Sequence, residues 1–213
     1  MSESRCAPTG WPNVFDVIAG SGHCGTKWLA TVLNSVPGAT WHHEMRTEIT
    51  RLPWYVLDLY EPDDAIFSSY WTFIRQQPGS GGDANSWPPE LLPAVNEVVP
   101  IRRIIYLTRD KDKQLHSLQT KSPVWSGAIS SKAASHKLGL YAEISGLPRD
   151  ARLLVEANDF MPGWLRSMGL HVDTYSLEDI TTSLAVLKEL APSLTGVELA
   201  AWQQKKINQK VFA

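Results

Sequence analysis

The chain has 213 residues, of which 43% are hydrophobic and 20% are charged, so it is long enough for one domain with a well-buried core. Its formal net charge of −2 argues against a nucleic-acid-binding protein, because neutralising many phosphates requires a basic excess. It contains no apolar run of about 18 residues, no apolar signal-peptide core near the N-terminus and too few cysteines for a disulfide framework, so we expect a cytoplasmic protein without membrane contact.

The predicted elements alternate between strands and helices along the chain. Residues 1–13 read as a loosely ordered lead-in, and residues 14–213 as a single domain. Short runs rich in branched and aromatic side chains predict strands at residues 14–19, 39–46, 101–108 and 152–156. Apolar residues at spacings of three and four predict helices at residues 26–36, 64–77, 110–120, 131–145 and after residue 157. The segment PGSGGDANSWPPE, residues 78–90, predicts a flexible loop, either a lid or slack. The alternation favours an α/β fold with a parallel sheet covered on both faces.

The segment GSGHCGTK, residues 20–27, joins the first predicted strand to the first predicted helix. We name it the glycine loop. Successive N–H groups of such a turn converge on one point, and the helix N-terminus adds a partial positive charge, so we expect a phosphate group near residues 22–26. Gly20 and Gly25 have the spacing of a nucleotide-triphosphate loop, but Thr26 and Lys27 stand in the reverse order. The match to a triphosphate and magnesium site is therefore impaired. The alternative is a turn with incidental glycines.

A second segment, YLTRDKDKQLHSL at residues 106–118, places a cationic residue at the end of a predicted strand. Ligands of open α/β sheets bind at the carboxyl ends of the strands, where Arg109 stands. Its guanidinium can bind a phosphate with two hydrogen bonds, and the hydroxyl of Ser117, two helical turns later, can add a third. The alternative is an exposed arginine paired with Asp110 or Asp112. Together, the two segments suit a nucleotide with phosphates at both its 5′ and 3′ positions.

These segments resemble the nucleotide-binding motifs of sulfotransferases that use 3′-phosphoadenosine 5′-phosphosulfate. The glycine loop is similar to the family's 5′ loop, with Gly25 and Thr26 on its Gly-Thr pair, and IIYLTRDKDKQLHSL is similar to its 3′-phosphate element. A weaker match is RLLVEANDF, residues 152–160, which is similar to a family segment that begins with a strand. The resemblance implies a three-layer α/β/α fold with a central parallel sheet, like that of P-loop NTPases. It also implies the phosphosulfate as donor, adenosine 3′,5′-bisphosphate as product and no metal. The nucleotide-binding residues that it implies are Ser21, Gly22, His23, Cys24, Gly25, Thr26, Lys27, Trp28, Arg109 and Ser117.

The chain departs from the family pattern at its expected catalytic positions. His23 stands where the family usually places Lys or Arg, and Lys27 stands at its second Thr. We expect these two side chains to neutralise charge on the bridging oxygen of the donor. The resemblance places a catalytic Glu or His in WHHEMR, where Glu44 is the first choice of general base and His43 and His42 follow. The alternative is a solvated polar strand edge.

The lead hypothesis is a sulfotransferase that moves a sulfuryl group to a hydroxyl or amine of a small-molecule or carbohydrate acceptor. One rival is a small-molecule kinase that uses ATP and magnesium. The other rival is a non-catalytic nucleotide-binding module. Cys24 reads as a small loop residue, since a cysteine-dependent phosphatase would need an arginine where Ala30 stands. We expect no nucleic-acid partner, and the sequence leaves the acceptor and the oligomeric state open.

Overall fold

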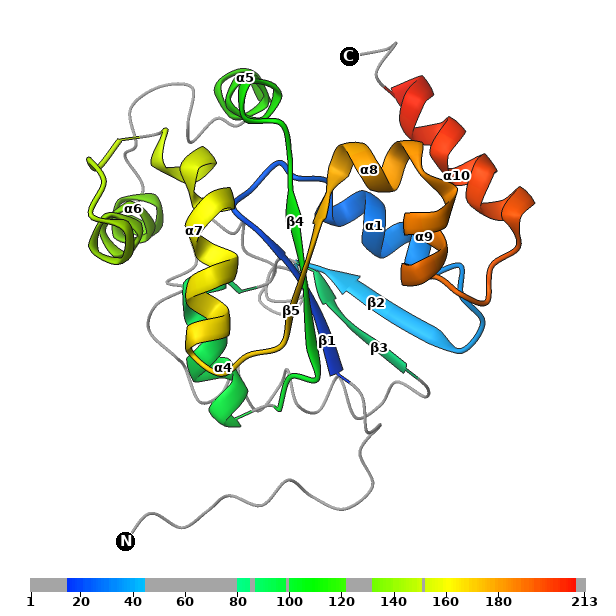
Figure 1. Ribbon diagram of the computed structural model, residues 1–213, viewed down its shortest axis with the longest axis horizontal. Coiled ribbons are helices and arrows are strands. Elements are labelled where there is room, and N and C mark those ends of the chain that lie inside the picture. Colours follow the sequence, from blue (N-terminus) through cyan, green and yellow to red (C-terminus); the bar gives the residue numbers. More distant parts are fainter. Residues whose placement is uncertain are drawn as a thin grey trace, which may run out of the picture.

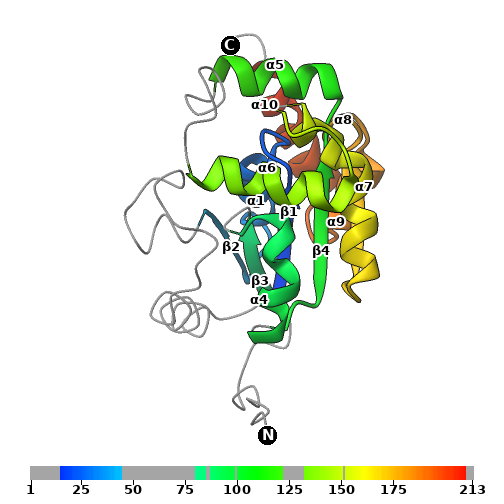
Figure 2. The ribbon, with the colours of Figure 1, turned by 90° about the vertical axis from the view of Figure 1, so that its left-hand side faces the viewer.

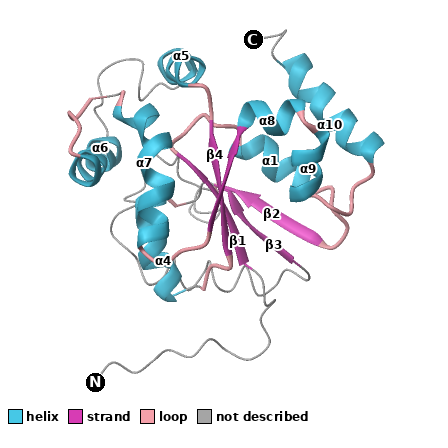
Figure 3. Cartoon of the chain, viewed as in Figure 1, coloured by secondary structure: helices cyan, strands magenta, loops and turns pink. Residues whose placement is uncertain are grey.

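A computed structural model gives the fold of most of the chain in three layers, with a sheet between two groups of helices (Figure 1). Figure 3 separates the helices, strands and loops of the described part, which comprises residues 15–44, 80–84, 87–98, 100–121, 132–150 and 152–209. The predicted lead-in over residues 1–13 and the predicted helix over residues 64–77 lie outside the described residues.

The strands of the described part form one sheet in the order β2-β3-β1-β4-β5, and every neighbouring pair is parallel. The strands are β1 (Phe15–Gly20), β2 (Ala39–His43), β3 (Ser80–Ala84), β4 (Arg103–Thr108) and β5 (Val172–Ser176). The predicted fold class, three layers around a central parallel sheet, is confirmed. All carboxyl ends of the strands therefore lie at one edge of the sheet.

Helices cover both faces of the sheet, and they enclose a separate hydrophobic core on each face. Successive strand residues point to opposite faces, so Ile104 and Tyr106 of β4 enter one core while Ile105 and Leu107 enter the other. The first core takes side chains from α4 (Leu92–Val98), α5 (Lys111–Lys121), α6 (Lys132–Ser145) and α7 (Leu153–Ser167), and Figure 2 looks onto this face. The second takes side chains from α1 (Thr26–Leu33), α8 (Leu177–Thr182), α9 (Leu184–Leu190) and α10 (Gly196–Gln209).

The prediction of a flexible loop over residues 78–90 is wrong in its described part. Residues 80–84 form β3, which lies between β1 and β2, and residues 89–91 form a short 3₁₀ helix, η1 (Pro89–Leu91). Strands are usually poor in glycine, which is why SGGDA reads as a loop. Here a glycine is required, because a Cβ at Gly82 would lie 1.9 Å from the carbonyl oxygen of Asp16 in β1. Close approach of two backbones thus explains the glycine in a strand.

The predicted strand over residues 152–156 is also wrong, because the segment RLLVE leads into helix α7 (Leu153–Ser167). Burial recurs at helical intervals along the whole element, at Leu154, Asn158, Met161 and Leu165. A short apolar run does not distinguish a strand from a buried helix, and Pro162 and Gly163 made the rest of the element read as a turn. The strand that completes this side of the sheet is β5, which the sequence reading missed.

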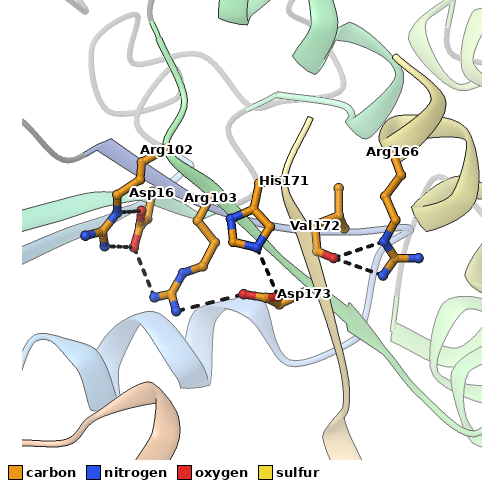
Figure 4. A network of polar contacts seen from close by, with 7 residues as sticks. All are labelled: Asp16, Arg102, Arg103, Arg166, His171, Val172 and Asp173. Atoms are coloured by element: carbon orange, nitrogen blue, oxygen red, sulfur yellow. Dashed lines mark hydrogen bonds and ion pairs between the residues drawn. The ribbon is translucent and has the colours of Figure 1, made fainter. Parts of the chain in front are cut away.

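Ion pairs connect three strands near their amino ends, away from the glycine loop (Figure 4). The carboxylate of Asp16 on β1 is buried, with 2% of the residue exposed. It accepts hydrogen bonds from Nε and Nη2 of Arg102, at 2.8 and 2.7 Å, and from Arg103 at 3.1 Å. Arg103 also approaches Asp173 on β5, at 4.0 Å. The network therefore holds β1, β4 and β5 in register at this edge.

The helices of the described part include none with the length and apolar character needed to cross a membrane.

Candidate nucleotide-binding site

The topology brings the glycine loop and Arg109 to the same edge of the sheet. From β1 the chain crosses to one side of the sheet, toward β2, and from β4 it crosses to the other side, toward β5. The crevice between two such strands, at their carboxyl ends, is where ligands of open α/β sheets bind. Gly20 pairs with Leu107 across β1 and β4, so the segments after these residues begin side by side.

The glycine loop has a backbone that most residues disfavour. Gly22 and Gly25 have φ angles of 113° and 89°, and His23 between them has a φ of 55°. A side chain at Gly25 would also collide with Leu177 of α8, since its Cβ would lie 2.6 Å from a methyl carbon. Positive φ at a residue with a side chain costs of order 1–2 kcal/mol and concentrates at functional sites. The loop is therefore held in a strained and closely packed conformation.

Helix α1 begins at Thr26 without a side-chain cap. Gly25 is its N-cap and makes no side-chain cap hydrogen bond, and the first turn contains no acidic residue. The unpaired N–H groups of a first turn attract anions, and the helix dipole adds to this attraction. The backbone here thus has the features of a phosphate site.

Arg109 and Ser117 both contact the glycine loop at His23. Nη1 of Arg109 donates to the carbonyl oxygen of His23 at 3.0 Å, and Nδ1 of His23 forms a 2.9 Å hydrogen bond with Oγ of Ser117. Nε of Arg109 is buried and has no hydrogen-bond partner among the described residues. Asp110 instead caps α5 by accepting from the N–H of Lys113, and no described carboxylate forms an ion pair with Arg109. Its charge is therefore available to an anion.

Two buried amide side chains, missed by the sequence reading, support the loop from beneath. Gln114 of α5 donates from Nε2 to Oγ of Ser21 at 2.8 Å and to the carbonyl of Gly22 at 2.7 Å. Asn158 of α7 donates to Oε1 of Gln114 at 2.7 Å and to the carbonyl of Arg109 at 3.3 Å. It accepts from Oγ of Ser21 at 3.0 Å. One available signal was the helical spacing of Gln114 with Ser117, which shares its buried face of α5.

Three of the predicted nucleotide-binding residues turn their side chains into the protein. Ser21 bonds to the two amides, Cys24 is fully buried and Trp28 packs in the second core. Burial raises the pKa of the Cys24 thiol to about 11, so this thiol remains protonated. The side chains at these three positions therefore contribute to the packing of the fold.

The predicted catalytic segment lies on the other side of the loop. Nε2 of His43, at the end of β2, is 3.5 Å from Oγ1 of Thr26 and 3.9 Å from Oε1 of Glu44. Glu44 has a φ of 55°, and its N–H continues the sheet by donating to Ala84 on β3 at 2.9 Å. The structure thus brings Glu44 and His43 to the start of α1.

Burial and a neighbouring cation tune these two groups. Loss of solvent raises the pKa of the Glu44 carboxyl, and the charge of Lys27 partly opposes this rise. Loss of solvent and the same lysine lower the pKa of His43 to about 4, so its imidazole is neutral at physiological pH. Lys27 itself is exposed at the start of α1. His42 precedes this pair on β2 and is partly buried.

The described residues contain no group of three or more His, Cys, Asp or Glu side chains placed to hold a metal ion.

Comparison with known proteins gives a likeness of fold. No family model matches the chain, and no curated protein matches it in sequence. Among solved structures, it is similar to a sulfotransferase from Alicyclobacillus acidocaldarius, with 15% identity and a TM-score of 0.52. The match covers 88% of this chain and 81% of that one. The chain therefore has a sulfotransferase-like fold of the P-loop type.

Proposed function

We propose that the protein is a sulfotransferase that uses 3′-phosphoadenosine 5′-phosphosulfate as its donor. The observation that carries the proposal is the meeting of two segments suited to bind anions, at the carboxyl ends of the neighbouring strands β1 and β4. The strained glycine loop precedes an uncapped helix, and Arg109 and Ser117 both contact that loop at His23. A nucleotide with phosphates at its 5′ and 3′ positions presents two anionic groups to such a pair. The sulfotransferase-like fold supports the same choice.

The residues present fit this donor. The first turn of α1 and the glycine loop would hold the 5′ phosphate through backbone N–H groups. Arg109, whose buried Nε has no partner among the described residues, and Ser117 would hold the 3′ phosphate. When bound, the donor supplies the activated sulfuryl group.

The remaining side chains account for charge and proton movement. His23 and Lys27 neutralise the negative charge that develops beside the loop, an electrostatic role that needs no metal. Glu44 accepts the proton of the acceptor hydroxyl or amine, and its raised pKa makes the ionised carboxylate a stronger base than an exposed one. His43 lies beside Glu44, and its imidazole is neutral. It can therefore take part in hydrogen bonds at this site without adding a positive charge next to the Glu44 carboxylate. The acceptor is a small molecule or a carbohydrate.

The first test is calorimetric titration of the protein with adenosine 3′,5′-bisphosphate and, separately, with ATP plus magnesium. The proposal expects binding of the bisphosphate without magnesium. Binding of ATP with magnesium and no binding of the bisphosphate would instead identify a kinase-like nucleotide site. Transfer from labelled donor into a pool of metabolites then separates an enzyme from a non-catalytic nucleotide-binding module.

Replacement of the proposed base gives a second test. Glu44→Gln keeps the size of the side chain and removes its basicity, so transfer should fall by about 10²- to 10⁴-fold while bisphosphate affinity stays near that of the wild type. Glu143→Gln, at an exposed position of α6, is the matched control and should change neither quantity. Full transfer activity in Glu44→Gln would exclude Glu44 as the base.

A further inference from the structure

The side chains of Ser21, Gln114 and Asn158 form a closed ring of hydrogen bonds under the crevice. Ser21 donates to Oδ1 of Asn158, Asn158 donates to Oε1 of Gln114, and Gln114 donates back to Oγ of Ser21, at 3.0, 2.7 and 2.8 Å. All three residues are buried, and Gln114 is fully so. We call this ring the amide triad. The positions of the nitrogen and the oxygen in each side-chain amide are fixed, because each amide nitrogen also donates its second N–H to a backbone carbonyl.

Those two carbonyls belong to the two anion-binding elements. Nε2 of Gln114 donates to Gly22 in the glycine loop at 2.7 Å, and Nδ2 of Asn158 donates to Arg109 at the end of β4 at 3.3 Å. The triad also joins three elements far apart in the sequence, since Ser21 follows β1, Gln114 lies on α5 and Asn158 lies on α7. One buried unit thus contacts the backbone of both elements at once.

We infer that Gln114 and Asn158 are positioning residues that fix the distance between the 5′- and 3′-phosphate sites by tying Gly22 and Arg109 to one amide triad. This inference rests on the proposed function for the identity of the ligand, although the tie itself is a property of the protein alone. A buried network in which every amide hydrogen and oxygen has a partner is rigid, because any displacement leaves a buried polar group unpaired. A fixed distance between the two phosphate sites favours a ligand whose two phosphates must bind at both sites at once.

The inference predicts a selective loss of affinity for the ligand with two phosphates. Gln114→Met keeps the length of the side chain and removes both donors. It should weaken adenosine 3′,5′-bisphosphate by about tenfold or more, while adenosine 5′-monophosphate and adenosine 3′-monophosphate each weaken by less than about threefold. Asn158→Leu should give the same pattern. Gln119→Met, at an exposed position of the same helix, is the control and should change none of the three affinities.

A second readout needs no nucleotide. Cys24 is fully buried in the glycine loop, with Sγ 3.3 Å from Nε2 of Gln114 and 3.1 Å from the carbonyl of Gly22. With Cys6→Ser in every protein, iodoacetamide should alkylate Cys24 slowly in the wild type and in Gln119→Met. In Gln114→Met the rate should rise by about tenfold or more, because the loop opens more often.

The outcomes are distinct. Equal loss of affinity for all three nucleotides in Gln114→Met and Asn158→Leu would reduce the triad to general stability and overturn the inference. An unchanged rate of Cys24 alkylation would overturn it as well. A wild-type protein that binds no bisphosphate would refute the proposed function, and the alkylation rates would still decide whether the triad holds the loop.

Discussion

Replacement of Arg109 by alanine is the sharpest test of the two-phosphate site. In the structure Nη1 of this guanidinium donates to the His23 carbonyl, and its buried Nε has no partner among the described residues. A two-pronged bond to a phosphate is worth about 3 kcal/mol, whereas the neutral carbonyl bond is worth about 1 kcal/mol. Arg109→Ala removes both bonds and should therefore weaken adenosine 3′,5′-bisphosphate by about 4 kcal/mol, or about three orders of magnitude.

The same variant should weaken adenosine 5′-monophosphate by only about fivefold, because that nucleotide loses no phosphate contact and suffers only from the loosened carbonyl of His23. Isothermal titration calorimetry of both nucleotides against both proteins measures the difference, which we expect to be about 3 kcal/mol, the worth of the lost phosphate contact. Arg152→Ala, at an exposed position before α7, is the matched control. Equal losses for the two nucleotides would show that Arg109 supports the loop and does not bind the 3′ phosphate.

Three further predictions concern stability, each measured by urea unfolding. Because the folded protein holds the pKa of His43 at about 4, against an ordinary value of 6.5, the unfolded chain binds a proton in this interval that the folded one does not. The free energy of unfolding should therefore decrease by about 2 kcal/mol as the pH falls from neutral to about 4.5. His43→Gln should remove this part of the pH dependence. An unchanged pH dependence in the variant would contradict the lowered pKa. Gly25→Ala should lower the free energy of unfolding by about 2 kcal/mol or more, since it adds a collision with Leu177 to the cost of positive φ, whereas Gly38→Ala has open space and should cost about 1 kcal/mol. Asp16→Asn weakens three charge-assisted bonds and should cost about 2 kcal/mol, so an unaltered unfolding midpoint would show that the network adds nothing.

The part of the fold that depends on local patterns was predictable. The apolar run ending at Gly20 and the branched run ending at Thr108 are strands, and the spacing in residues 26–33 gives helix α1. The glycine loop and Arg109 each follow a strand of the predicted parallel sheet. Because the carboxyl ends of parallel strands lie at one edge, their closeness in space was also predictable. The structure confirms the predicted fold class.

The errors have tertiary causes. β3 reads as a loop because its need for glycine comes from β1, which is a neighbour in space only. Residues 152–156 were predicted as a strand because five residues are too few to distinguish the helical period of about 3.6 from the strand period of about 2. The pairing of Gln114 with Asn158 depends on two helices meeting under the loop, and no single-sequence pattern records it. The positive φ of Glu44 likewise cannot be predicted from the sequence, because it depends on the path of the backbone after β2.

The central place of β1 has a consequence for folding during synthesis. This strand is made before both of its partners, because Phe15 pairs with Gly81 of β3 and Asp16 pairs with Arg103 of β4. Until β4 leaves the ribosome, one edge of β1 is unpaired and the carboxylate of Asp16 lacks Arg102 and Arg103. Long-range pairing of this kind slows folding and exposes an aggregation-prone edge. The central strand therefore gains its second partner only when β4 has been translated, and chaperone dependence should be greatest in the interval between the synthesis of β1 and that of β4.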